Sequence, residues 1–303
     1  MKLTYHEGVN FGDSINPLLF NKLLPGYFNE SKKELFLGVG SILGLKRPFD
    51  ETEKIIVFSS GFGANAESTY GRLPTISELV KYDIRCVRGP LTADLLKIPK
   101  SKAICDGAIL LPKVFSINEK KTYQYSYMPH VGSFAFFSGW KSLIESLGIK
   151  LIDPRDSPIK IIKEINQTET LFAEAMHGAI CADAFRVPWI PIKTSKTINE
   201  FKWKDYCLSM NLAYKAYDTF TLFDKGVLSD IAMSKFNRHL LSSIASESYY
   251  LYQNIIIERQ VKLFFKKAKM ISPTLSLNSV LEDNTSRLLE ELQSVQEDYC
   301  QRQ

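Results

Sequence analysis

The sequence is poor in the residues that most often carry metal or redox chemistry, with only 4 His and 5 Cys among 303 residues. The number of cysteines is odd, and no two of them are spaced as a CxxC clamp or as a zinc site. We therefore expect no bound metal, and we expect buried free thiols in a reducing compartment. The cysteines are Cys86, Cys105, Cys181, Cys207 and Cys300.

Long hydrophobic runs are also missing. No run approaches the ~20 apolar residues of a membrane span, and no apolar stretch follows the lysine at residue 2. We expect no signal peptide and a cytoplasmic protein, with the inner membrane as a possible peripheral contact. The net charge of +5 suits an anionic ligand or lipid surface, but it is too small and too evenly spread for a nucleic-acid-binding protein.

Several standard catalytic motifs are absent as well. The sequence has no HExxH, no GxSxG and no GxGxxG after a predicted strand. The small residues at 59–63 resemble a phosphate loop, but no lysine follows at P-loop spacing. P-loop nucleotide hydrolysis and a standard dinucleotide site are therefore excluded.

The hydrophobic content of 45% is sufficient for a globular core, and 303 residues predict two domains, with one large domain as the alternative. Short apolar runs alternate with helical patterns, which predicts parallel sheets covered by helices. The simplest architecture is two α/β domains, 1–116 and 117–218, facing each other across a cleft. The predicted strands are 2–5, 34–37, 54–58, 83–87, 123–128, 150–152, 170–172 and 189–192, and the predicted helices are 15–24, 140–147, 159–165 and 177–185.

A linker is predicted around 111–122, and strand signals stop after residue 219. We expect the residues from 219 to 303 to form helices that pack back on both domains. The segment 279–303 has leucines at helical spacing among charged residues, so it predicts an amphipathic helix that docks on the protein or forms a dimer.

The clearest local feature is the segment 174–185, where His177 lies at a predicted strand-to-helix turn. Gly178 allows close approach of a ligand, and a helix N-terminus favours phosphate or carboxylate. His177 is therefore a candidate proton donor. A histidine that simply packs in the turn explains the pattern equally well.

Other polar residues also follow predicted strands, where ligands bind in open α/β sheets. Asn10 and Asp13 would hold sugar hydroxyls, although a helix-capping turn needs the same residue types. Arg88 would bind a carboxylate or phosphate, with a surface salt bridge as the alternative. Asp106, His130 and the segment 153–155 also follow the ends of strands.

Several short segments occur along the chain in a fixed order: Asn10-Phe11-Gly12-Asp13, Gly38-Val39-Gly40-Ser41, Gly61-Phe62-Gly63, Arg88-Gly89-Pro90, Asp106-Gly107-Ala108, Pro129-His130, Asp153-Pro154-Arg155 and Met176-His177-Gly178-Ala179. Together, and in this order, they resemble the polysaccharide pyruvyl transferase family over the range from Asn10 to about Cys207. The segment 202–207 further resembles the bacterial exopolysaccharide branch, which includes the ketal pyruvyltransferase of xanthan synthesis.

The resemblance implies a fold like that of GT-B glycosyltransferases. It also implies transfer of pyruvate from phosphoenolpyruvate to two hydroxyls of one sugar, which gives a cyclic ketal and phosphate without a further cofactor. The family histidine matches His177, and the family arginine matches Arg88. From the chemistry of this reaction we assign His177 as acid or phosphate clamp and Asp13 or Glu174 as base. The substrate contacts that we expect are Arg88, Arg155, Gly178, Asn10, Gly12, Ser41, Gly61, Asp106, His130 and Lys202.

One position departs from the family pattern. Many relatives have Ser-Arg-Leu-His-Gly where this chain has Glu174-Ala175-Met176-His177-Gly178. The second arginine is therefore missing, and Arg155 or Lys202 would have to supply its charge.

Acceptors in such pathways are commonly lipid-linked oligosaccharides, so we expect a glycan partner and a peripheral membrane contact. The segment 264–270, with the tyrosines at 249–252 before it, would rest on an anionic leaflet. A solvated helix end is the alternative. A nucleotide-sugar glycosyltransferase and a non-catalytic scaffold of polysaccharide assembly are the alternative functions.

Overall fold

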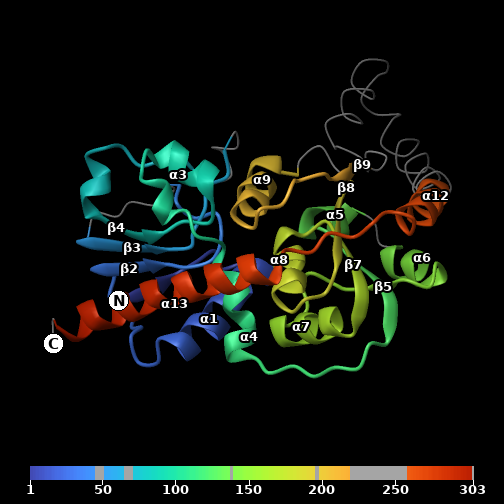
Figure 1. Cartoon of the computed structure of the whole chain (residues 1–303), viewed down its shortest axis with the longest axis horizontal. Helices are drawn as coiled ribbons and strands as arrows, with labels where there is room; N and C mark the ends of the chain where they lie inside the picture. The colour runs from blue at the N-terminus through green and yellow to red at the C-terminus, as the bar shows by residue number, and fades with distance from the viewer. Residues whose placement is uncertain (45–50, 65–70, 137–138, 195–197, 219–257, 302–303) are drawn as a thin grey trace, which may run out of the picture.

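Two parallel β-sheets lie side by side in the computed structural model, each covered by helices (Figure 1). The structure describes residues 1–44, 51–64, 71–136, 139–194, 198–218 and 258–301. It is an α/β protein, and the first sheet falls within residues 1–116 and the second within 117–218.

The first sheet has four strands in the order β1-β2-β3-β4, all parallel. Leu35, Phe36 and Leu37 are all buried in succession, as expected for a parallel strand with both faces covered. The strands are β1 (Lys2–Thr4), β2 (Glu34–Leu37), β3 (Lys54–Phe58) and β4 (Tyr82–Cys86).

The second sheet has five parallel strands in the order β6-β5-β7-β8-β9. Its first strand in the chain, β5, therefore lies between its second, β6, and its third, β7. This strand order has a topological switch point at the carboxyl ends of β5 and β7, where ligands bind in open α/β sheets. The strands are β5 (Tyr123–Met128), β6 (Lys150–Leu151), β7 (Thr168–Ala173), β8 (Trp189–Lys193) and β9 (Tyr217–Asp218).

Helices cover the faces of the sheets, and the described chain ends in the long helix α13 (Figure 1). The α-helices are α1 (Phe11–Leu23), α3 (Pro90–Leu96), α4 (Leu111–Val114), α5 (Val131–Phe136), α6 (Trp140–Ser146), α7 (Pro158–Asn166), α8 (Met176–Ala184), α9 (Glu200–Ser209), α12 (Glu258–Ala268) and α13 (Asn278–Cys300). Three short 3-10 helices are η1 (Glu78–Lys81), η2 (Lys100–Lys102) and η3 (Gly107–Leu110).

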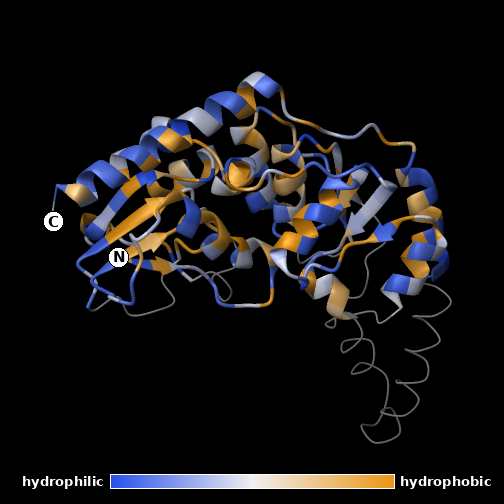
Figure 2. Cartoon of the chain, turned by 90° about the horizontal axis from the view of Figure 1, so that it is seen from below, coloured by the Kyte–Doolittle hydropathy of each residue, from blue (hydrophilic) through white to orange (hydrophobic). Residues whose placement is uncertain are grey.

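One hydrophobic cluster extends through both halves of the molecule. It includes Ile15 of α1, Phe58 of β3 and Leu110 of η3 from the first half, together with Ile162 of α7 and Ala179 of α8 from the second. Figure 2 shows the hydrophobic strands near the N-terminus and the hydrophobic helix faces turned toward them. The two halves therefore share a core where these helices pack.

Asn16 fastens α1 to the first sheet. Pro17, inside α1, has no N–H to donate to the carbonyl of Asp13, and the Asn16 Nδ2 donates to that carbonyl instead at 3.0 Å. The same amide exchanges hydrogen bonds with Val39, whose N–H donates at 2.8 Å and whose carbonyl accepts at 3.0 Å. These two hydrogen bonds fix the first turn of α1 beside the loop after β2.

The C-terminal helices pack on different halves of the protein. Helix α12 buries Val261 and Phe265 against Tyr127 and Phe172 of the second sheet. Helix α13 buries Leu288, Leu292 and Val295 in the shared core and runs along the first half (Figure 1). The apolar face of α13 is therefore docked on its own chain, and dimer formation through this helix stays a prediction.

The predicted strands and helices named above are confirmed, with ends that differ by a few residues. The linker prediction is wrong in part, because 111–114 forms α4, whose backbone continues from η3. Four of the five predicted buried thiols are confirmed, whereas Cys300 is exposed. Burial raises the pKa of the thiols of Cys86, Cys105 and Cys181. The tyrosines at 249–252 lie outside the described residues.

Candidate functional site

The loops at the carboxyl ends of the two sheets meet directly. The N–H of Phe11, after β1, donates to the carbonyl of Pro154, after β6, at 3.2 Å. The Asn199 Nδ2, at the start of α9, donates to the carbonyl of Ala64, after β3, at 3.2 Å. Polar side chains from both sheets are therefore gathered at one place, as the position after each strand predicted.

His177 and Asp106 approach each other across this junction. His177 is the second residue of α8, after β7, and Asp106 caps the N-terminus of η3. The His177 Nε2 lies 3.7 Å from the Asp106 Oδ2. Asp106 is 0% exposed, and neither of these two buried atoms has a hydrogen-bond partner.

Gly12, at the start of α1, makes room for the imidazole. A Cβ at this position would lie 1.9 Å from the His177 Nδ1, so a side chain cannot be accommodated without moving the ring. Beside it, the Asn10 Nδ2 donates to the Asp13 Oδ2 at 2.8 Å. The structure thus brings together the predicted residues Asn10, Gly12, Asp13, Asp106 and His177.

Ser59 extends this polar group from the first sheet. It follows β3 with a φ of 65°, a backbone conformation that is uncommon outside glycine and that occurs often at active sites. Its hydroxyl is buried without a hydrogen-bond partner and lies where a Cβ on Gly107 would come within 2.5 Å. In the sequence this loop resembles only a phosphate loop, and no local pattern distinguishes Ser59 in it.

Arg88 lies in a buried network between the two halves. Its Nε donates to the Asp205 Oδ2 at 3.2 Å, its Nη1 to the Ser41 hydroxyl at 2.9 Å and its Nη2 to the Phe62 carbonyl at 2.7 Å. A Cβ on Gly61 would lie 2.2 Å from the guanidinium carbon. The predicted residues Arg88, Ser41 and Gly61 are therefore grouped, and the alternative of a surface salt bridge for Arg88 is wrong because both partners are 0% exposed.

Asp205 is the partner that sequence analysis did not select. Its carboxylate accepts from the N–H groups of Leu91 and Thr92 at 2.9 and 3.1 Å and from the Thr92 hydroxyl at 2.6 Å. Helix α9 of the second half thereby caps helix α3 of the first half. No local sequence signal distinguishes this aspartate from the charged residues around it, because its partners lie more than a hundred residues away.

Glu174 is a buried carboxylate with both oxygens in use. Its Oε1 accepts from the Ser133 hydroxyl at 3.0 Å and from both the N–H and the hydroxyl of Thr194, and its Oε2 accepts from the His130 N–H at 2.9 Å and from the Tyr127 hydroxyl. Burial raises the pKa of this carboxyl group. These bonds join β5, α5 and β8, and they do not favour the prediction that Glu174 acts as a base.

His130 follows β5 on the other side of the switch point. Its Nδ1 accepts from the Gly132 N–H at 3.1 Å. Burial, assisted by the positive charge of Lys202, lowers the pKa of His130 to about 4. His130 is therefore a neutral imidazole at physiological pH, with Lys202 close enough to influence it.

The remaining predicted residues lie at the margin of the site. Arg155 is half exposed, forms a two-point ion pair with Asp153 and stacks on Phe134 at 4.4 Å. Gly178 lies against Met128, where a Cβ would come within 2.6 Å of the sulfur.

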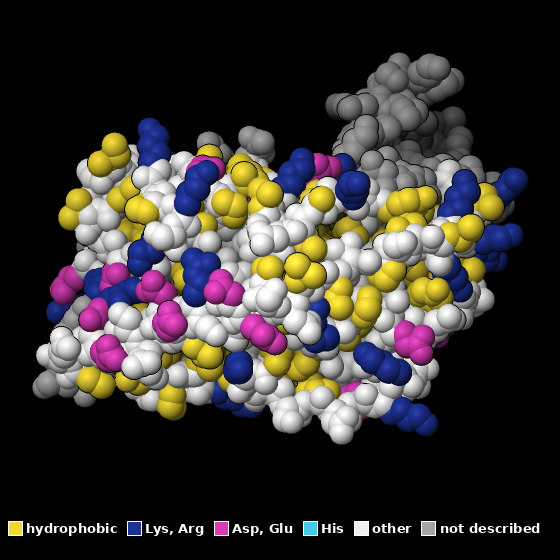
Figure 3. All heavy atoms as spheres, viewed as in Figure 1, with side chains coloured by type: hydrophobic (Ala, Val, Ile, Leu, Met, Phe, Trp, Pro, Cys, Tyr) yellow, Lys and Arg dark blue, Asp and Glu magenta, His cyan; other side chains and the backbone are white. Residues whose placement is uncertain are grey.

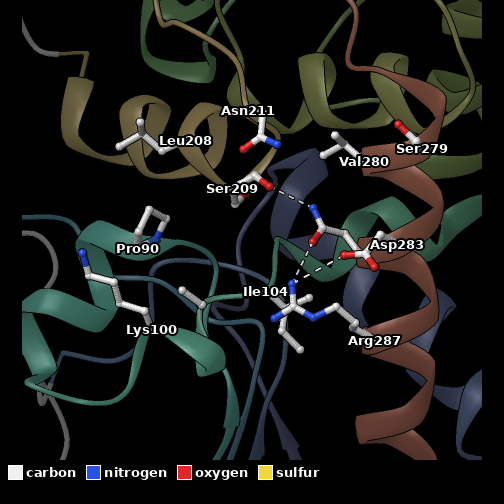
Figure 4. A pocket seen from close by; sticks show the side chains of 12 residues that line it. Pro90, Lys100, Ile104, Leu208, Ser209, Asn211, Ser279, Val280, Asp283 and Arg287 are labelled. Carbon is white, nitrogen blue, oxygen red and sulfur yellow. Dashed lines mark hydrogen bonds and ion pairs between the residues drawn. The ribbon is translucent and has the colours of Figure 1, made fainter.

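A pocket of about 390 Å³ lies elsewhere, between η2, the end of α9 and the first half of α13 (Figure 4). The Asn284 Nδ2 crosses it to donate to the Ser209 carbonyl at 2.8 Å, and Arg287 points in from α13. None of the predicted site residues lines it. Within the described ranges, no group of three or more His, Cys, Asp or Glu side chains is placed to hold a metal ion.

The comparisons with known proteins identify the family of the chain. The family model for polysaccharide pyruvyl transferases matches residues 14–196, which include β2 to β8 and the His177 turn. The chain belongs to the polysaccharide pyruvyl transferase family. Its predicted resemblance to that family is thereby confirmed.

A relative within this group of proteins is the succinoglycan biosynthesis protein ExoV of Rhizobium meliloti (strain 1021). It is 39% identical over 220 residues, which are 71% of this chain and 66% of the relative. The matched region thus spans just under two thirds of that protein. No solved structure matches this family member.

None of its described helices is long and apolar enough to cross a membrane.

The network around Arg88 predicts the effect of removing Asp205. Asp205→Ala leaves the Arg88 charge buried without its carboxylate, so we expect the free energy of unfolding to fall by about 3–5 kcal/mol. Urea denaturation measures the loss. The matched control is Asp156→Ala, whose exposed ion pair with Lys160 should contribute at most about 1 kcal/mol. Equal losses in the two variants would contradict a buried charge network.

His130 predicts a pH dependence of stability. The pKa of His130 is about 4 in the folded protein, which is lower than the ordinary value of about 6.5. The unfolded chain therefore takes up a proton first as the pH falls from 6.5 toward 4, and the stability present above pH 6.5 is lost over this window. In His130→Asn, whose side-chain oxygen can replace Nδ1, the loss of unfolding free energy over this window should be smaller by about 2–3 kcal/mol. Urea denaturation at both pH values measures it, and His6→Asn, at an exposed histidine, should follow the wild type.

Proposed function

We propose that this protein transfers pyruvate from phosphoenolpyruvate to two hydroxyls of one sugar in an exopolysaccharide or capsule repeat unit. The product is a cyclic ketal, and phosphate is released. The observation that carries the proposal is the junction of Asp13, Asp106 and His177 at the carboxyl ends of both sheets, in a chain of the polysaccharide pyruvyl transferase family.

The reaction needs an acid and a base within reach of one donor molecule. The enol carbon of phosphoenolpyruvate forms a bond to the first hydroxyl oxygen while its methylene carbon takes a proton. The second hydroxyl oxygen then replaces phosphate at the same carbon. One of the two hydroxyl protons therefore ends on the new methyl group and the other on phosphate, so the reaction needs no redox cofactor.

The residues supply these roles in the following way. His177 donates the proton to the methylene carbon, and Asp13, held by Asn10, accepts the proton of the attacking hydroxyl. We prefer Asp13 to Glu174 as the base because five hydrogen bonds fill the Glu174 carboxylate.

The donor also carries phosphate and carboxylate groups, which need cationic partners. Arg155 is half exposed beside the junction, since its neighbour Pro154 bonds to Phe11, and it is our preferred anion ligand. Lys202 lies near His130 and is a second candidate. Arg88 is a third candidate anion ligand, although it is held in its buried network. Among its hydrogen-bond partners there, Ser41 is the most exposed.

We further infer a GT-B-like arrangement, in which acceptor and donor bind to opposite sheets across an interdomain cleft. Two parallel sheets whose carboxyl ends meet support it. Because this architecture also serves nucleotide-sugar glycosyltransferases, ligand binding must separate the two functions. Thermal stabilisation by phosphoenolpyruvate, but not by UDP or GDP sugars, favours pyruvyl transfer. Acceptor-dependent phosphate release eliminates a non-catalytic scaffold.

The central prediction concerns His177. His177→Ala should lower the rate of acceptor-dependent phosphate release from phosphoenolpyruvate by about 10²–10⁴-fold, because a general acid contributes this much to a rate. His6→Ala, at an exposed histidine, is the matched control and should retain the wild-type rate. Near-normal turnover by His177→Ala would show that another group is the acid.

The acceptor that we propose is a lipid-linked oligosaccharide, with α12 as the membrane contact. Lys and Arg side chains gather at the end of the molecule that α12 occupies (Figure 3). The structure corrects one part of the sequence prediction, because the rings of Phe264 and Phe265 are buried against the second sheet. The exposed apolar side chains there are instead Leu263 and Met270, which are 53% and 87% exposed.

Flotation with anionic liposomes tests this contact. We expect binding at low salt that is lost as salt rises, because an electrostatic attraction to anionic lipid is screened. Lys266→Glu together with Lys267→Glu should abolish it, whereas Lys97→Glu together with Lys100→Glu, in the first half, should not. Absence of flotation even at low salt would rule out the membrane contact.

A further inference from the structure

Three buried polar atoms without a hydrogen-bond partner lie at the candidate site: the Ser59 Oγ, the Asp106 Oδ2 and the His177 Nε2. A buried polar atom without a partner costs about 1–3 kcal/mol, so folded proteins tolerate few of them. Two of these atoms, on Asp106 and His177, are complementary in charge when the imidazole is protonated and lie 3.7 Å apart.

Asp106 is held rigidly in the orientation that this pairing needs. Its Oδ1 accepts from the Ala108 N–H at 3.0 Å and thereby caps η3. The other oxygen, Oδ2, is left directed toward the imidazole. Asp106 is 0% exposed, so its carboxylate is shielded from bulk solvent, and the His177 Nε2 is the cationic partner beside it when the ring is protonated.

The opposite edge of the imidazole is held by the first turn of α1. The His177 Nδ1 lies so close to Gly12 that a Cβ there would come within 1.9 Å. This turn also presents Asn10 and Asp13. The ring is therefore fixed between two elements of the first half, with Nε2 toward Asp106 and Nδ1 beside Gly12.

The neighbouring carboxylates have hydrogen-bond partners of their own. Asp13 accepts from Asn10 at one oxygen, and Glu174, three residues before His177, accepts five hydrogen bonds. Of these three described carboxylates, Asp106 is the one with a buried oxygen that has no hydrogen-bond partner.

We propose that Asp106 is a positioning residue that accepts the Nε2–H of His177 and so directs the Nδ1 of the ring to the substrate. The catalytic role of Asp106 rests on the proposed function, whereas the pairing of Asp106 with His177 is independent of it. A carboxylate partner selects one tautomer of a histidine and stabilises the imidazolium form.

The proton balance follows from this assignment. The imidazolium gives its Nδ1 proton to the methylene carbon of phosphoenolpyruvate and becomes neutral, while the Nε2 hydrogen stays on the ring and is donated to the Asp106 carboxylate. The proton taken by Asp13 from the first hydroxyl then returns to Nδ1 through solvent. Asp106 itself stays ionised throughout, so no further acid or base is required.

The first experiment reads the tautomer of His177 by nitrogen-15 NMR of the histidine rings in the wild-type protein. The chain has 4 His, and the signal missing from His177→Gln assigns the ring. We expect neutral His177 to carry its hydrogen on Nε2. A hydrogen on Nδ1 overturns the proposal, and this result requires neither turnover nor a mutant that folds.

The second experiment uses Asp106→Asn, which keeps the Oδ1 that caps η3 but replaces the charged oxygen with an amide nitrogen that cannot accept Nε2–H. We expect a loss of about 10–100-fold in kcat for phosphate release, with KM for phosphoenolpyruvate changed by less than about threefold. A fall in kcat at a nearly constant KM distinguishes a misplaced acid from a loss of donor binding.

The matched control is Asp183→Asn, at a buried carboxylate of α8 that accepts from Trp189, Tyr206 and Ser276. This variant should lose stability with kcat unchanged. An unchanged kcat in Asp106→Asn overturns the proposal. If wild-type protein releases no phosphate from phosphoenolpyruvate with a competent acceptor, the proposed function fails, and the tautomer still decides whether Asp106 pairs with His177.

Discussion

The structure depends on one buried ion pair, between Arg88 of the first half and Asp205 of the second. A buried charge is tolerated only when it is paired and hydrogen-bonded, and both of these side chains are completely buried. Asp205 meets this condition by bonding to Arg88, Leu91 and Thr92 together. Helix α9 is thereby held against α3, and the loops after the strands of both sheets are brought to one junction.

Buried carboxylates organise the second half in the same way. Glu174 joins three elements around the carboxyl ends of β5 and β7, and Asp183 fixes the segment before α13 through the Ser276 N–H. Each carboxylate is satisfied by several donors from distant parts of the chain. Glu174 lies three residues from His177 and was a candidate base in the sequence. Its hydrogen bonds instead stabilise the loop that carries His177.

The proposed chemistry uses the boundary between the two halves. The acid, His177, comes from the second half, whereas Asp13 and Asp106 come from the first. A small shift of one half relative to the other would therefore change the distances among all three groups. The buried charges and the shared hydrophobic core at the junction hold the two halves in place, and catalysis requires reacting groups to be placed closely.

Hydrophobic periodicity and short ordered motifs are local properties, so the α/β class, the strands from Lys2 to Lys193 and the family could be predicted from the sequence. Asp13, Arg88, Asp106 and His177 could also be predicted as candidates, since polar residues after parallel strands gather at one edge. Which of these groups lie next to one another depends on how the two halves pack. The roles of Asp205, Ser59 and Glu174 depend on partners that are distant in the chain, and local patterns carry no information about such partners.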